Sequence, residues 1–148
     1  MQERDLGWIA GIVDGEGTIT ICRISGYMRP IVQVVNTNMS LLLEVQQIFA
    51  EIIGKKTRIC MITRYKKHTL DCYRIQVTKQ FEVETILKTI KPYLIAKVEQ
   101  ARLVLDFLDL FYMDQYNKTN LHHKYLAVNL LVNLLLQKLQ NLHLQKYH

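Results

Sequence analysis

The period of the apolar residues changes several times along this chain, and the order of the changes constrains the fold more than any other feature. Residues 18–24 (TITICRI) alternate between apolar and polar side chains, and residues 30–36 (PIVQVVN) are rich in β-branched residues, which predicts two strands. Apolar side chains then recur at helical spacing until Gly54, a typical helix-ending glycine. The same succession follows in two further predicted strands and a helix, at 57–65, 69–77 and 79–90.

A helix from about residue 5 precedes these elements, and another is predicted after Pro92, at 95–111, so that the order is αββαββα. Two hairpins, each followed by a helix, predict one four-stranded antiparallel sheet with helices on one face and an open second face. The fold class is therefore α+β. We expect one domain at 1–116 and a C-terminal helical extension at 117–148, whose heptad-like leucines favour packing on the same domain over a coiled coil.

Basic residues are concentrated in the predicted hairpins. Residues 55–79 contain eight Lys and Arg and a single acid, Asp71, although the whole chain has a net charge of only +6. Residues 17–43 contain Arg23 and Arg29 and no acid. This distribution indicates a basic face for an anionic partner such as nucleic acid, although a solvated basic loop region would have the same composition.

Three features predict an intracellular, reducing location without a membrane anchor. The N-terminus has acids where a signal peptide would be basic, and the three cysteines have no paired spacing. The longest apolar stretch, 126–136, is interrupted by Asn129 and Asn133 and is too short to cross a bilayer.

The first predicted helix has an unusual composition. Gly7, Gly11 and Gly15 recur every four residues, which places a strip without side chains along one helix face, where another backbone could approach closely. Asp14 and Glu16 stand at the end of this helix, where the helix dipole disfavours negative charge. Carboxylates in such a place indicate a metal site, whereas an isolated D-G-E-G would also fit a simple turn with solvated acids.

Residues 9–17 (IAGIVDGEG) resemble the LAGLIDADG motif of the homing endonucleases, and the predicted order αββαββα is that of the family core. Residues 92–101 (PYLIAKVEQA) resemble the family segment before its last core helix, and residues 36–38 (NTN) are similar to a polar stretch near its active site. Since only one motif is present, the chain resembles the single-motif members, which form homodimers with a saddle-shaped sheet.

The resemblance implies a Mg²⁺-dependent, sequence-specific endonuclease that cuts one phosphodiester bond per DNA strand and leaves 3′ overhangs. Glu16, Lys97 and Asn38 would be catalytic, and Glu16 and the Gly15 carbonyl would bind the metal. Mn²⁺ would substitute for Mg²⁺, and Ca²⁺ would bind without supporting cleavage. Where the family has a second basic group, the chain has Leu41, Leu42 and Leu43, so that a strand residue such as Arg64 or Lys66 would have to replace it.

The partner implied is double-stranded DNA with a long, near-palindromic target. The residues predicted to contact DNA are Thr18, Thr20, Cys22, Arg23, Arg29, Gln33, Arg58, Arg64, Lys66, Lys67, Arg74 and Gln76. Those predicted at the homodimer interface are Gly7, Trp8, Ala10, Gly11 and Asp14, of which Asp14 would also support the local structure. Organelles (chloroplasts or mitochondria) and the bacterial or phage-infected cytoplasm are the expected locations.

Three alternatives remain at this point. The chain could be an intron-encoded RNA maturase, a catalytically inactive DNA-binding regulator of the same fold, or a relic of the family without a specific activity.

Overall fold

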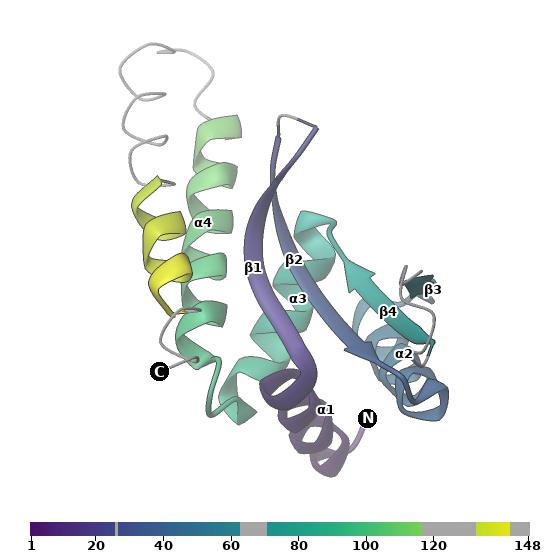
Figure 1. Cartoon of the computed structure of the whole chain (residues 1–148). Helices are drawn as coiled ribbons and strands as arrows, with labels where there is room; N and C mark the ends of the chain where they lie inside the picture. The colour runs from purple at the N-terminus through teal and green to yellow at the C-terminus, as the bar shows by residue number, and fades with distance from the viewer. Residues whose placement is uncertain (26, 63–70, 117–132, 143–148) are drawn as a thin grey trace.

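The computed structural model describes residues 1–25, 27–62, 71–116 and 133–142 (Figure 1). The elements follow the predicted order, which confirms the α+β class and the αββαββα core. They are α1 (Glu3–Glu16), β1 (Gly17–Ile24), β2 (Tyr27–Asn36), α2 (Met39–Ile53), β3 (Ile59–Ile62), β4 (Cys72–Val77), α3 (Gln80–Ile90), the short 3₁₀ helix η1 (Lys91–Tyr93) and α4 (Val98–Tyr116).

The four strands form one antiparallel sheet in the order β1-β2-β4-β3. Ile19, Val32 and Val77 are aligned across three strands, and all are buried. The helices pack on this side of the sheet (Figure 1). The next row, Thr18, Gln33 and Gln76, lies on the opposite side and is half-buried. The sheet therefore has an apolar, helix-covered face and a polar face, as the alternation in the sequence predicts.

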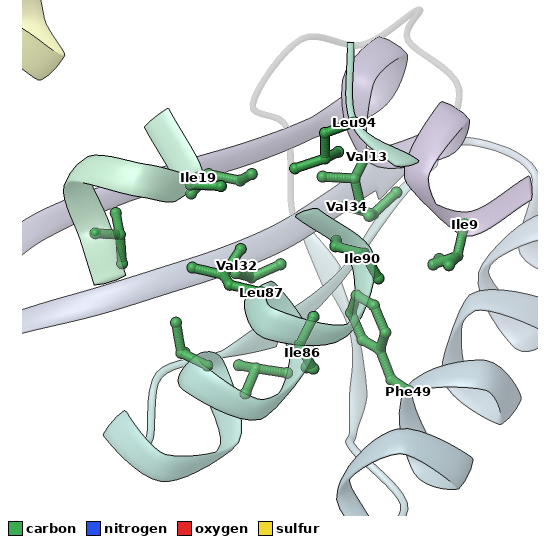
Figure 2. Close-up of a cluster of buried hydrophobic side chains, with 14 of the residues drawn as sticks. Ile9, Val13, Ile19, Val32, Val34, Phe49, Ile86, Leu87, Ile90 and Leu94 are labelled. Atoms are coloured by element: carbon green, nitrogen blue, oxygen red, sulfur yellow. The ribbon is translucent and has the colours of Figure 1, made fainter. Parts of the chain in front are cut away.

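The core lies between the sheet and the helices. Figure 2 shows Phe49 from α2 together with Ile86, Leu87 and Ile90 from α3 and Val34 from β2. All of these side chains are fully buried. Removal of this apolar surface from water is the main force that holds the helices on the sheet.

Strand β2 begins at Tyr27, three residues earlier than predicted from the Pro at position 30. Pro lacks an N–H group and usually ends a central strand. Here the β2–β4 pairing starts only at Val32, so that Pro30 pairs with β1 alone. On the side of β2 that faces β4, position 30 needs no N–H donor.

The second hairpin is shorter than predicted in the part that the structure describes. Strand β3 covers Ile59–Ile62 and β4 covers Cys72–Val77, whereas the predicted strands extended to 65 and from 69. Residues 63–70 lie outside the described part of the chain.

The predicted C-terminal extension is described over residues 133–142, which are helical. Leu139 is buried in the core, and Leu135 and Leu136 pack against it. Residues 117–132 and 143–148 lie outside the description. Within the described residues, no helix is both long and apolar enough to span a membrane.

Candidate functional site

Helix α1 passes directly into strand β1, and Gly17 makes this junction possible. The Gly17 N–H donates to the carbonyl of Val13. A Cβ atom at position 17 would lie 2.6 Å from the Val13 oxygen and 2.8 Å from its Cα, closer than any side chain can come. Only glycine therefore fits here, and Glu16, the last residue of α1, is left exposed beside the first residue of the sheet.

Asp14 and Lys97 join the end of α1 to the segment before α4. The carboxylate of Asp14 accepts the backbone N–H groups of Ile95 at 2.7 Å and of Lys97 at 2.9 Å. The ammonium group of Lys97 donates to the carbonyl of Val13 at 2.8 Å and to that of Asp14. The Lys97 residue is only 2% exposed. A cation at the C-terminus of a helix is favourable, because it faces the negative end of the helix dipole.

The predicted helix started at residue 95, whereas α4 begins at Val98. These bonds explain the difference. Asp14 binds the N–H groups of Ile95 and Lys97, which keeps this segment out of the helix. The carbonyl of Lys97 accepts the N–H of Ala101 at 3.0 Å and so makes the first hydrogen bond of α4.

Asn38 lies at the N-terminus of α2 and caps this helix. Its side-chain oxygen accepts the N–H of Leu41 at 3.2 Å, and its own N–H donates to the side chain of Asn36 at 2.8 Å. Because Gly17 pairs with Val34, the end of β2 and the start of β1 lie at the same end of the sheet. Asn38 and Glu16 are therefore at the same end, both exposed.

The described residues of one chain do not complete a metal site on their own, since no group of three or more His, Cys, Asp or Glu could hold an ion. The exposed Glu16 carboxylate and the Gly15 carbonyl, in the last turn of α1, are the candidate ligands. They fit Mg²⁺, which commonly takes one or two carboxylates and fills its other positions with water and phosphate oxygens.

The register assigns most of the predicted DNA contacts to one surface, the open face of the sheet. In this face Cys22 pairs with Arg29, and Arg74 pairs with Val35 and Cys60. The complete set of predicted contacts found on it is Thr18, Thr20, Cys22, Arg29, Gln33, Arg74 and Gln76. Arg58 is exposed just before β3, and Arg64, Lys66 and Lys67 lie outside the described residues.

Arg23 is an exception among these residues. It pairs with Met28, and it alternates with Cys22, so that it lies on the helix-covered side of the sheet together with Ile21. Met28 packs against the hydrophobic core, which confirms the side. The prediction that Arg23 shares a surface with Arg29 is therefore wrong. The alternation of residues 18–24 already places Arg23 on the side of Ile19 and Ile21, whereas the prediction grouped Arg23 with Arg29 by charge.

No protein-family model and no curated protein matches this sequence. Solved structures do match. Homing endonuclease I-CvuI in complex with DNA aligns with a TM-score of 0.67 and 24% identity, over 95% of this chain and 85% of that one. The homing endonuclease I-TnaI aligns with a TM-score of 0.59 and 15% identity, over 95% of this chain and 96% of that one. LAGLIDADG homing endonuclease I-GzeII, in complex with its DNA target, aligns with a TM-score of 0.59 and 17% identity, over 78% of this chain and 38% of that one.

This chain has the LAGLIDADG fold. The predicted resemblance is thus confirmed for the architecture. Residues 9–17, which resemble the LAGLIDADG motif, form the second half of α1 and the first residue of β1.

Helix α1 exposes the glycine strip, which consists of Gly7, Gly11 and Gly15. A Cβ atom at any of these positions would meet no atom of the described chain within 4 Å. Trp8, beside the strip, is 38% exposed. Among the described residues, nothing covers this face of α1.

Ala10 does not belong to that face. Its side chain is fully buried with Ile9 and Val13 in the core of its own chain, so its predicted place at a dimer interface is wrong. Small residues occur on both sides of α1, and the spacing did not separate them. Asp14 is half-buried and bonded within the chain, and its place at an interface stays a prediction.

The sequence-based predictions missed several exposed residues. Ile95, held by Asp14, is 88% exposed, and Cys60 is exposed on the open face beside Arg74. The position of Cys60 follows only from the register of β3 with β4.

Burial raises the pKa of the Cys22 thiol, so that this side chain presents a neutral group at pH 7.

Proposed function

We propose that this protein is a sequence-specific double-strand DNA endonuclease that acts as a homodimer with a divalent metal. The observation that carries the proposal is the position of Glu16. Its carboxylate is exposed at the end of α1, directly before the sheet that carries the polar and basic open face. An acid that can bind a metal thus adjoins a surface that can bind DNA.

The open face has the chemistry needed to read a DNA groove. An antiparallel ribbon of strands fits the major groove, where Arg binds guanine and Gln binds adenine through paired hydrogen bonds. Arg29 and Arg74 supply the first kind of side chain, and Gln33 and Gln76, which are adjacent across β2 and β4, supply the second. Lys66 and Lys67, between the predicted strands of the second hairpin, would contact phosphates. The similar structures of I-CvuI and I-GzeII contain DNA.

Glu16 and the Gly15 carbonyl would hold Mg²⁺. The bound ion would supply Lewis acidity, which activates water and stabilises the leaving 3′ oxygen. Asn38 lies at the same end of the sheet, and its amide could orient the attacking water, because the cap of α2 fixes the side chain. Structures of I-CvuI with DNA were obtained in the presence of Mg, with the DNA not cleaved, and in the presence of Ca, which is consistent with binding of a divalent cation by that protein.

The reaction also favours a homodimer. Two strands must be cut, and one chain offers one exposed Glu16. Contact between the glycine strips of two copies would be isologous, with each α1 packed on its symmetry mate. Such a contact would bring both Glu16 residues close to the two-fold axis and would match a near-palindromic target with 3′ overhangs after cleavage.

The substitution Glu16→Gln tests the proposal. A randomised duplex pool is incubated with the purified protein and Mg²⁺, and the cut ends are sequenced to obtain the target. Glu16→Gln should bind this target as the wild type does and should not cut it, because the amide removes the metal-binding charge. Glu44→Gln, which changes an exposed acid on α2, is the matched control and should cut normally. Normal cleavage by Glu16→Gln would overturn the proposed metal site.

Two further measurements, selection of bound duplexes and a splicing assay, distinguish the alternatives. Specific binding without cleavage by the wild type would indicate a DNA-binding regulator. Protein-dependent splicing of a host intron, without DNA cleavage, would indicate a maturase.

A further inference from the structure

The open face of the sheet presents polar side chains that are not paired with other described residues. Strands β1, β2, β3 and β4, as the structure describes them, contain no Asp or Glu. Arg74 is half-buried, yet its guanidinium has neither an ion pair nor a hydrogen bond to any described residue. The same holds, within the described residues, for the amides of Gln33 and Gln76. Polar groups that are partly removed from water favour a ligand that supplies their missing hydrogen bonds.

The register places Arg74 at the end of the sheet where Glu16 stands. Gly17, the residue after Glu16, pairs with Val34 of β2. Val35, the next residue of β2, pairs with Arg74. Arg74 therefore belongs to the row of the open face that is level with the end of α1.

Two further rows lie at increasing distance from this end. Gln76 pairs with Gln33, two residues before Val35 on β2, and Arg29 stands four residues before Gln33. A strand rises about 3.4 Å per residue, so that the three rows are separated by about 7 Å and then about 13 Å. A base pair occupies about 3.4 Å of the DNA axis, and the groove winds around this axis. A strand that follows the groove therefore passes about one or two base pairs in the first step and about three or four in the second.

We infer that each half of the DNA target has a guanine, an A·T segment and a second guanine, in this order from the centre outward and with this spacing. Arg74 reads the inner guanine and Arg29 the outer one, each through O6 and N7 in the major groove. Gln33 and Gln76 read the A·T segment between them, through N6 and N7 of adenine. The inference rests on the proposed function in one respect, the binding of DNA by the open faces of two copies with Glu16 near the centre.

Base preference is measured by binding, so that the test does not require cleavage. Duplexes that the wild type binds from a randomised pool without divalent metal are sequenced. The affinities of variants are then measured for the selected target and for each of its single-base-pair changes. Arg74→Gln should change the preference at the inner position from G·C to A·T by about tenfold, because Gln pairs with adenine. Gln76→Ala should lose about tenfold selectivity in the A·T segment, and Arg29→Gln should do so at the outer guanine.

Two variants serve as controls. Arg23→Gln, on the helix-covered side of the same hairpin as Arg29, should leave every base preference unchanged. Arg74→Lys keeps the positive charge and should retain the preference for guanine, which separates the loss of base contacts in Arg74→Gln from a loss of folding.

The order of the three positions is the decisive result. The position that responds to Gln76→Ala should lie between those that respond to Arg74→Gln and Arg29→Gln. Any other order, or a uniform loss of affinity for all sequences in Arg74→Gln, would overturn the inference. Failure of the proposed function has a different signature: the order would be found, but the wild type would cut no duplex or Glu16→Gln would still cut. Absence of sequence-specific binding by the wild type would overturn both.

Discussion

Asp14 and Lys97 are bonded to each other in both directions. The Asp14 carboxylate accepts the backbone N–H of Lys97 at 2.9 Å, and the Lys97 ammonium group donates to the backbone carbonyl of Asp14. The two residues are separated by 83 positions in the sequence. Their contact joins the end of α1 to the start of α4. A change at either residue should therefore affect both of these helix ends.

Asp14→Ala should destabilise the protein strongly. The substitution leaves the N–H groups of Ile95 and Lys97 without their acceptor, and hydrogen bonds to a charged group contribute about 1.5–3 kcal/mol each. We expect a loss of about 2–4 kcal/mol in the free energy of unfolding, measured by urea denaturation. Asp71→Ala, at an exposed acid before β4, is the control. Equal stability of the two variants would contradict this role of Asp14.

Gly17 and Gly11 should respond to alanine in opposite ways. Gly17→Ala places a Cβ atom 2.6 Å from the Val13 oxygen and should unfold the junction, with a lower melting temperature and no cleavage. The Cβ atom of Gly11→Ala meets no atom of the described residues within 4 Å, apart from the backbone of its own helix, and alanine favours a helix by about 1 kcal/mol over glycine.

The folded monomer should therefore tolerate Gly11→Ala, and only the association of two copies should weaken. Analytical ultracentrifugation across a concentration series measures this effect. A Gly11→Ala variant that dimerises as tightly as the wild type would show that the glycine strip is not the contact.

Arg29 and Arg23 form a matched pair on opposite sides of the same hairpin. Both are exposed, but only Arg29 lies on the open face. DNA binding should weaken steeply with salt, because phosphate contacts release counterions. Arg29→Gln should reduce the slope of log K against log salt by about 1 if it contacts phosphate, or weaken binding to one base pair if it contacts a base. Arg23→Gln should change neither, and a reduced slope in that variant would contradict the register.

Thiol alkylation should map the open face directly. Cys60 is exposed and should react first with a maleimide. Cys22 should react more slowly, because burial raises the pKa of its thiol and lowers the thiolate fraction. Cys72 is buried and should react only on unfolding. Bound DNA should protect both Cys22 and Cys60, as followed by mass spectrometry; alkylation of both at the free rate in the complex would place the DNA elsewhere.

The first turn of α4 should contribute a small pH dependence. Hydrogen bonds from Arg102, at 3.0 and 2.6 Å, lower the pKa of Glu99 in the folded protein. This contribution to stability is fully present above the ordinary Glu pKa and is lost as the pH falls through the lowered value. Glu99→Gln should cost less than about 1 kcal/mol at pH 7, because the pair is largely exposed. The difference from the wild type should vanish in acid and shrink in concentrated salt.

The sequence by itself determined the order of the elements and the apolar side of each strand. Patterns with a period of two or 3.6 residues include Ile19, Val32, Phe49 and Ile86. Such a pattern shows which side of a strand or helix is buried, whichever element packs against it. It also located the motif and the acid at the end of α1. All of these properties depend on residues that are close neighbours in the chain.

Only the tertiary structure decided what depends on distant residues. The pairing register aligned Gln33 with Gln76 and placed Arg29 opposite Cys22, although each hairpin alone would allow other alignments. The packing of the core buried Ala10. The place of the Lys97 ammonium group follows from a contact across 83 residues, and no local period encodes such a contact.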